Sequence, residues 1–218
     1  MTSAPSDLSS WLSGADKIII FDLEWTSWTG FMESGWSMPG KHREIIQIGA
    51  VKVDCQNDFK EISSFDLLVK PSITPDLSEY ITALTGVTQE QVDAEGVAFS
   101  QALQEFLKFC GGVNFACSYG DDNVVIAENC ALHNIDCPDF FAGGFNLCPL
   151  FSEALGVTGQ GINSGNLTAH LGLPTVGNPH NALADARGIA AALHHLMTSQ
   201  HLRHPTQEID KCPAHADQ

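Results

Sequence analysis

Two carboxylates one pleat apart, at the end of an otherwise apolar strand, constrain this chain more than any other feature. Residues 17–26 read Lys-Ile-Ile-Ile-Phe-Asp-Leu-Glu-Trp-Thr. Side chains alternate between faces in an extended strand, so Asp22 and Glu24 share one face. Apolar residues on both faces predict a buried, central strand. Two desolvated like charges so close together need a cation or must take up a proton. The stretch therefore predicts a divalent metal site.

The composition is that of an ordinary folded protein. Of its 218 residues 44% are hydrophobic and 17% charged, and the length is sufficient for a full hydrophobic core. No stretch has the unbroken apolar length of a membrane span, and residues 1–14 lack the basic and apolar regions of a secretion signal. Seven cysteines, without a Cys-x-x-Cys pair, indicate reduced and mostly buried thiols. We therefore expect a cytoplasmic protein that does not contact a membrane.

The net charge is strongly negative. Ten Lys and Arg residues against 26 Asp and Glu residues give a formal charge of −16. Proteins that bind nucleic acid along a long track usually carry a basic surface. If nucleic acid is the substrate, contact should be confined to a short end segment. Binding should then depend only weakly on salt, because few basic residues can displace counterions.

The hydrophobic pattern predicts one folded domain between two polar ends. We expect a flexible N-terminus over residues 1–16, the functional domain over residues 17–200, and a loose polar tail over residues 201–218. No internal repeat and no linker divides the middle range.

Three strands come first in the domain, followed by alternating helices and strands. The sequence predicts strands at 17–25, 44–54, 62–70, 113–118 and within 137–145, the second and third joined as a hairpin. Helices are expected at 75–84 with Thr74 as the cap, from a capping box at Thr88, and at 99–110, 121–133, 146–155, 166–171 and 182–197. This order predicts an α/β protein with a mixed five-stranded sheet, three antiparallel strands and then parallel strands, flanked by helices.

A second acidic segment begins the last predicted helix. Residues 178–187 read Asn-Pro-His-Asn-Ala-Leu-Ala-Asp-Ala-Arg. Asn181 is a good N-cap, and Asp185 lies in the first turns, where the helix dipole favours a negative side chain. His180 precedes the helix and should be more mobile than Asp185. Taken alone, both residues also fit an ordinary helix start. Together, a rigid carboxylate and a movable imidazole suit a metal ligand paired with a general base.

In order along the chain, these motifs resemble those of the DEDDh 3′→5′ exonucleases, which have the DnaQ-like, RNase H-like fold. Within that family they are most similar to the Eri-type and KapD-like exoribonucleases. The resemblance rests on residues 21–26 (Phe-Asp-Leu-Glu-Trp-Thr), 44–49 (Glu-Ile-Ile-Gln-Ile-Gly), 68–71 (Leu-Val-Lys-Pro), 84–93 (Leu-Thr-Gly-Val-Thr-Gln-Glu-Gln-Val-Asp) and His180 with Asp185. It covers residues 17–197.

The resemblance implies hydrolysis of phosphodiester bonds from a 3′ end with two metal ions. Asp22, Glu24, a middle aspartate and Asp185 would hold two Mg²⁺ or Mn²⁺ ions, and His180 would take the proton from the attacking water. Oxygen ligands without cysteine suit these metals. The substrate would be the 3′ end of single-stranded nucleic acid, with RNA favoured over DNA, and the product a nucleoside 5′-monophosphate.

The middle aspartate departs from the family pattern. Members of the family tend to carry it three residues after a glycine, and here the residue three after Gly120 is Asn123. Asp121 and Asp122 both remain. Asp122 is the preferred ligand because apolar residues of the following turns lie on its helical face, which would leave Asp121 as the N-cap. Asp121 as the ligand stays open.

The resemblance also implies contacts with the terminal nucleotide. The candidate residues are Trp25, Thr26, Leu84 and Thr85. A terminal base would lie against Trp25 or Leu84, since stacking tolerates any base. Trp28 and Trp36 in the following loop are either further stacking surfaces or anchors that fold the loop over the sheet.

A second class of function is a protein that kept this fold, lost the reaction and acts as a binding or scaffolding module. A protein that had lost catalytic activity would usually also have lost one of the acidic metal ligands or His180. Here all five residue types are present, with only the middle position shifted. The sequence therefore favours the enzyme.

Overall fold

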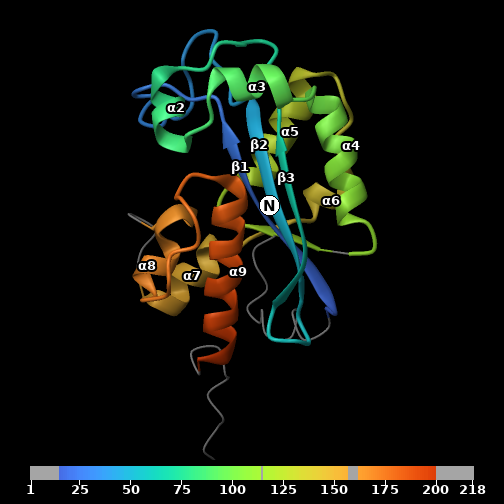
Figure 1. Ribbon diagram of the computed structural model, residues 1–218, viewed down its shortest axis with the longest axis vertical. Helices are drawn as coiled ribbons and strands as arrows, with labels where there is room; N and C mark the ends of the chain where they lie inside the picture. The colour runs from blue at the N-terminus through green and yellow to red at the C-terminus, as the bar shows by residue number, and fades with distance from the viewer. Residues whose placement is uncertain (1–14, 114, 157–161, 200–218) are drawn as a thin grey trace, which may run out of the picture.

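A five-stranded sheet forms the centre of the computed structural model, which describes residues 15–113, 115–156 and 162–199 (Figure 1). Its strands are β1 (Lys17–Trp25), β2 (Ile45–Asp54), β3 (Lys60–Leu68), β4 (Ala116–Ser118) and β5 (Phe145–Asn146). Their order is β3-β2-β1-β4-β5. The first three strands pair antiparallel, and β4 pairs parallel with both β1 and β5. The predicted fold class is confirmed. The predicted tail, residues 201–218, lies outside the described residues, as does nearly all of the predicted flexible N-terminus.

Helices cover both faces of the sheet. They are α2 (Glu79–Thr85), α3 (Gln89–Glu95), α4 (Phe99–Cys110), α5 (Asp122–Leu132), α6 (Asp139–Ala142), α7 (Cys148–Leu155), the 3-10 helix η1 (Ser164–Asn166), α8 (Leu167–His170) and α9 (Ala182–Thr198). One face packs against α4, α5 and α6, and the other against α9 with α7 and α8 beside it. Helices α2 and α3 lie at the end of the sheet where β1 finishes (Figure 1). Within the described part of the chain, no helix has both the length and the apolar character needed to cross a membrane.

Strand β1 is central and buried on both faces, as its sequence predicts. Its odd-numbered apolar side chains pack against α4, α5 and α6, while Ile18 and Ile20 pack against α9. Burying one such side chain stabilises the fold by about 1.5–3 kcal/mol. Asp22 and Glu24 continue the face that meets α9 and are buried as well. The strand therefore carries two carboxylates into the interior at its C-terminal end.

The first helix after the hairpin begins later than the sequence predicts. The prediction of a helix at 75–84 capped by Thr74 is wrong at its start, because α2 begins at Glu79 with Ser78 as its cap. The buried carboxylate of Glu44 accepts hydrogen bonds from the backbone N–H groups of residues 72–74, at 2.7–2.9 Å. These three bonds hold the segment as a loop, so the helix forms only after it.

Strands β4 and β5 are shorter than predicted. Strand β4 covers only the end of the predicted 113–118, and helix α6 occupies part of the segment in which a fifth strand was expected. Strand β4 pairs with β1 at Ile19 and Ile20. Beyond Ile20, the backbone N–H groups on the edge of β1 that faces β4 can donate to acceptors outside the sheet.

Candidate metal centre and active site

Four buried carboxylates from three distant segments meet near the end of β1. Asp22 and Glu24 belong to β1, Asp122 begins α5, and Asp185 lies in the first turn of α9. Their exposed fractions are 5%, 7%, 3% and 4%. One oxygen each from Glu24 and Asp185 and one ring nitrogen of His180 all lie within 4.8 Å of one another. The charge of Asp122 acts on Asp22 and Glu24, and that of Asp185 acts on both as well, so the five predicted residues lie near one another.

Helix α9 reaches the carboxylates because β2 has a glycine opposite Asp22. Gly49 is the register partner of Asp22. A Cβ atom on Gly49 would lie 2.0 Å from the nitrogen of Leu183 and 2.1 Å from the carbonyl carbon of Ala182. The first turn of α9 therefore rests on the backbone of β2, a close approach that only glycine permits. A glycine inside an apolar strand is the sequence signal for such an approach, although the sequence analysis did not use it.

Two side-chain amides hold the start of α9. Asn181 accepts the N–H of Ala184 at 3.1 Å and is the N-cap, as predicted. The Gln47 side chain on β2 accepts the N–H of Ala182 at 3.1 Å. These bonds satisfy two N–H groups that the helix itself leaves free. They fix the position of Asp185, and the sequence analysis missed the contribution of Gln47.

Helix α5 brings Asp122, rather than Asp121, into the group of carboxylates. The Oδ1 atom of Asp122 accepts the backbone N–H of Leu23 at 3.1 Å, on the part of β1 beyond its pairing with β4. Asp121 is exposed and occupies the N-cap position. Asp122 is therefore the residue that lies in the group of carboxylates, and its role as a metal ligand stays a prediction.

His180 stands just before α9 in a conformation that few residues other than glycine adopt. Its φ is 61°, and backbone strain of this kind concentrates at functional sites. Its backbone N–H donates to Oδ2 of Asp185 at 3.1 Å. The hydroxyl of Ser164, which the sequence analysis missed, donates to the same oxygen at 3.4 Å. The side chain of Asp185 is therefore oriented from two sides.

Burial raises the pKa of all four carboxyl groups, and for each it is the largest cause. The pKa of Asp22 is raised well above its usual value by burial and then by the charges of Asp122, Glu24 and Asp185. Burial, followed by Asp185 and Asp122, likewise raises the pKa of Glu24. Burial raises the pKa of Asp122 to about 7. The pKa of Asp185 is raised by burial, while its bond from the His180 N–H works against the rise. Without a cation, these carboxyl groups therefore keep their protons to a higher pH than carboxyl groups exposed to solvent do.

The donor set fits divalent cations that prefer oxygen ligands. Within the described ranges, the ion pairs of Lys and Arg residues involve none of the four carboxylates, so no Lys or Arg side chain neutralises them. Carboxylate oxygens are the ligands that Mg²⁺ and Mn²⁺ favour. A bound cation would remove the repulsion that raises these pKa values.

The residues predicted to contact the terminal nucleotide lie at the same end of the sheet. Thr26 and Thr85 are buried, and each hydroxyl donates to a backbone carbonyl and accepts a backbone N–H. Their hydroxyls are therefore used within the protein, which leaves backbone and methyl groups for a nucleotide. Trp25 and Leu84 are half-buried and retain exposed surface.

Trp28 and Trp36 anchor the loop that follows β1. Both rings pack edge-on against the fully buried Phe31, with centroids 5.3 and 5.5 Å from its ring. Trp36 also contacts Trp25 at 5.8 Å. Of the two roles considered for these residues, the loop anchor is the one that these contacts demonstrate.

Known proteins share this pattern. The RNase_T family model, described as "Exonuclease", matches residues 19–193. The 3′-5′ exonuclease crn-4 of Caenorhabditis elegans is 28% identical over 196 residues, which are 84% of this chain and 63% of that protein. The 3′-5′ exoribonuclease 1 of Rattus norvegicus is 27% identical over 184 residues, 80% of this chain and 51% of that protein. The chain thus spans less than two thirds of these relatives.

Solved structures share the fold. The nuclease domain of 3′hExo, described as a DEDDh family member bound to rAMP, has a TM-score of 0.75 and 24% identity, covering 85% of this chain and 93% of that domain. The structure of cell-death related nuclease 4 (CRN-4) has a TM-score of 0.70 and 24% identity, covering 84% of this chain and 64% of that one. The fold is thus the RNase H-like fold of these exonucleases. Since the family model covers most of the sequence, the chain belongs to the RNase T exonuclease family, among the DEDDh 3′-5′ exonucleases.

Proposed function

We propose that this protein is a metal-dependent 3′→5′ exonuclease that removes nucleoside 5′-monophosphates from the 3′ end of single-stranded RNA. The observation that carries the proposal is the convergence of four buried carboxylates from β1, α5 and α9, with His180 beside them. Membership of the exonuclease family supports the reaction class. RNA is favoured over DNA because several relatives, such as that of Rattus norvegicus, are named exoribonucleases.

In this proposal Asp22, Glu24, Asp122 and Asp185 would hold two Mg²⁺ or Mn²⁺ ions. When bound, the ions supply an activated water and stabilise the negative charge on the leaving 3′-oxygen. The carboxylates themselves are preorganised: Asp122 by the Leu23 N–H, and Asp185 by His180 and Ser164. Because the site is buried, electrostatic attraction to cations is stronger there than at a surface.

His180 takes a proton from the attacking water through a ring nitrogen. That nitrogen lies within 4.8 Å of a carboxylate oxygen of Glu24 and of Asp185, and the residue is half-buried, so it can reach both the site and solvent. The water oxygen bonds to phosphorus while the bond from phosphorus to the 3′-oxygen breaks. The 3′-oxygen takes up a proton, which leaves a chain one nucleotide shorter and a free nucleoside 5′-monophosphate.

Trp25, Thr26, Leu84 and Thr85 would bind the terminal nucleotide. We propose that its base lies against the exposed part of Leu84 or Trp25, a contact that tolerates any base. The hydroxyls of both threonines have partners within the protein, so polar contacts would come from the backbone.

The test uses RNA and DNA of one sequence, labelled at either the 3′ or the 5′ end, with Mg²⁺ and with or without EDTA. A 5′ label should give a ladder of products shortened from the 3′ end, and a 3′ label should give mononucleotide at once. EDTA and Asp22→Asn should each stop the reaction, and RNA should be degraded faster than DNA. Products released from the 5′ end, or activity that survives EDTA, would refute the proposal. Binding of Mn²⁺ and RNA without cleavage would instead indicate the alternative, a catalytically inactive protein that acts as a binding or scaffolding module.

A further inference from the structure

A pocket of about 430 Å³ opens beside the loop between β1 and β2, and no step of the proposed reaction uses it. Its lining includes three consecutive basic side chains, a tryptophan and an acidic residue of α5, namely Lys41, His42, Arg43, Trp36 and Glu128. In a chain with a net charge of −16, such a cluster of basic side chains is unusual.

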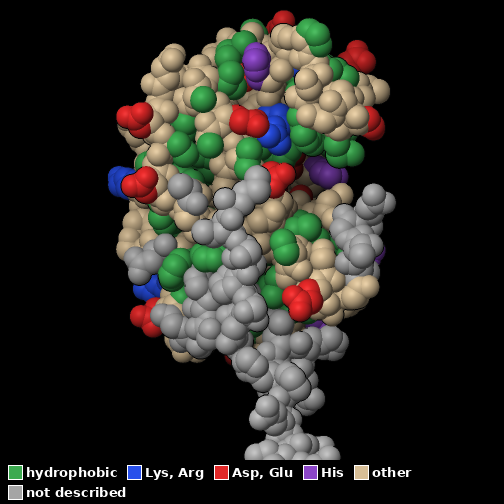
Figure 2. All heavy atoms as spheres, turned by 180° about the vertical axis from the view of Figure 1, so that it is seen from behind, with side chains coloured by type: hydrophobic (Ala, Val, Ile, Leu, Met, Phe, Trp, Pro, Cys, Tyr) green, Lys and Arg blue, Asp and Glu red, His purple; other side chains and the backbone are tan. Residues whose placement is uncertain are grey.

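The pocket adjoins the candidate active site through two shared elements. The Thr26 hydroxyl donates to the carbonyl of His42 at 2.7 Å, and Thr26 lies two residues, about 7 Å of strand, after Glu24. Helix α5 supplies Asp122 to the site and, about 9 Å farther along its axis, Glu128 to the pocket. On the face drawn in Figure 2, acidic and histidine side chains border a hollow, and basic and acidic side chains lie together just above it.

Lys41 carries a positive charge that no carboxylate of the described residues neutralises. Its Nζ lies 4.1 Å from the centroid of the Trp28 ring, and it belongs to none of the ion pairs found in the described ranges. By contrast, Arg187 and Lys70 are paired with acidic residues. A phosphate that enters the pocket would therefore meet a free cation.

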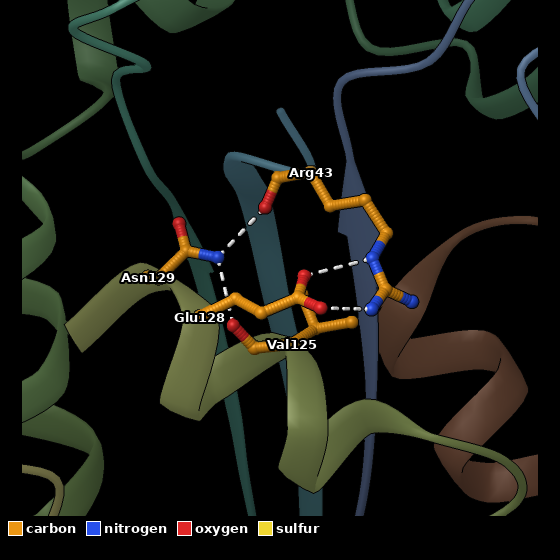
Figure 3. Close-up of polar contacts among 4 residues, drawn as sticks. All are labelled: Arg43, Val125, Glu128 and Asn129. Atoms are coloured by element: carbon orange, nitrogen blue, oxygen red, sulfur yellow. Dashed lines mark hydrogen bonds and ion pairs between the residues drawn. The ribbon is translucent and has the colours of Figure 1, made fainter. Parts of the chain in front are cut away.

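Arg43 is held in place rather than free. Its guanidinium binds the Glu128 carboxylate through two hydrogen bonds, one of 2.9 Å (Figure 3). Its guanidinium carbon lies 5.4 Å from the Trp36 ring centroid and 5.8 Å from that of Trp25. The Arg43 side chain is 10% exposed, whereas that of Glu128 is 42% exposed. The Arg43 guanidinium thus packs against the Trp36 ring, and the carboxylate of Glu128 lies exposed at the pocket.

We propose that this pocket binds the RNA backbone on the 5′ side of the nucleotide being removed. Lys41 contacts a phosphate, and an upstream base stacks on Trp36. The proposal rests on the proposed function for the position of the 3′ end. Among the described residues that line the pocket, Lys41 is the one Lys or Arg without an ion pair, so the affinity gain is small and only weakly salt-dependent, which fits the acidic composition. Glu128 opposes binding and keeps it weak.

The first test measures equilibrium binding of labelled RNA in EDTA, so it does not require hydrolysis. With RNA of about ten nucleotides, Lys41→Ala should raise Kd about fivefold and lower the slope of log Kd against log salt by about 0.7. A dinucleotide, too short to reach the pocket, should lose less affinity. The matched control is Lys52→Ala, whose ammonium binds the carbonyl of Gly111 far from the site, and which should leave Kd unchanged. Equal effects of Lys41→Ala and Lys52→Ala on Kd would overturn the proposal.

The two proposals can fail separately. If RNA binding depends on Lys41 but the protein never shortens RNA, the proposed function is wrong and the proposed binding pocket stands.

The second test asks whether a substitution at Glu128 strengthens or weakens RNA binding. Glu128→Gln should lower Kd for the longer RNA several-fold, because it removes an opposing charge and releases Arg43. Glu61→Gln is the matched control, since Glu61 receives the same two-point contact from Arg187 outside the pocket. It should leave Kd unchanged. If the Arg43–Glu128 pair were only a clamp for the loop, Glu128→Gln would leave RNA binding unchanged or weaken it, and that result would overturn the proposal.

Discussion

The backbone N–H of Leu23 donates to the carboxylate of Asp122, 99 residues later in the chain. This bond lies on the part of β1 that β4 does not cover, and it aligns the start of α5 with Asp22 and Glu24. One hydrogen bond thus connects the central strand to the third acidic position of the site.

Asp122→Asn should remove most of the activity, while Asp121→Asn should not. Asparagine keeps an oxygen for the Leu23 N–H but lacks the charge that a cation requires, so the rate should fall on the order of a thousandfold. Asp121 is exposed and outside the group, so its variant should stay within about twofold of wild type. Initial rates of hydrolysis of 5′-labelled RNA by the two variants and wild type measure the difference. A larger loss of rate in Asp121→Asn than in Asp122→Asn would show that Asp121 is the metal ligand instead.

Gly49→Ala should displace α9 and with it Asp185. The added methyl carbon would lie 2.0–2.1 Å from backbone atoms of α9, which cannot move aside as a flexible side chain would. We expect a loss of about 3 kcal/mol or more in the free energy of unfolding and at least about a hundredfold in rate. Gly143→Ala is the control, because its Cβ would make only an ordinary contact of 3.8 Å. Wild-type behaviour of Gly49→Ala in urea unfolding and hydrolysis would contradict this account of the helix position.

The metal-free protein should lose stability as the pH rises from about 4 to about 8. A carboxyl whose pKa is raised by folding holds its proton more tightly in the folded state than in the unfolded chain. The resulting stability is fully present below the ordinary pKa of 3.8 and is lost as the pH passes the folded value, about 7 for Asp122.

Urea unfolding in EDTA across this range measures the loss. The decline should be steeper in wild type than in Asp122→Asn, and Mn²⁺ should flatten it because a cation replaces the protons. A wild-type curve parallel to that of Asp122→Asn would show that folding does not perturb this carboxyl.

Asp22→Asn should separate catalysis from folding. Asp22 is buried beside three other carboxyls, whose charges oppose its own ionisation. In EDTA at pH 8 the variant should be at least as stable as wild type, because it removes this repulsion, yet it should not hydrolyse RNA. The midpoint of thermal unfolding and an activity assay on the same preparation provide both readouts. A variant that fails to fold would count against a metal-binding role for Asp22.

The sequence was informative wherever a local rule determined the structure. The apolar run around Asp22 predicted the central strand, the Thr88 capping box predicted α3, and Asn181 predicted the start of α9. The apolar face of α5 likewise predicted that Asp122 points inward, with Asp121 at the N-cap position. In each case the decisive residues are neighbours in the chain.

Features set by distant contacts were not predictable in this way. Helix α2 starts late because Glu44, about 30 residues upstream, binds the backbone before it. Gln47 and Ser164 act on α9 only once the sheet has formed. The pocket at Lys41 likewise depends on the docking of α5 against the loop.

The buried carboxylates at the end of β1 should form a binding site for divalent cations. Calorimetric titration of Mn²⁺ into metal-free protein measures this binding without depending on hydrolysis. We predict about two ions per chain in wild type and the loss of at least one in Asp22→Asn, with Asp121→Asn like wild type. No binding by wild type at millimolar Mn²⁺, or the same stoichiometry in Asp22→Asn, would contradict it.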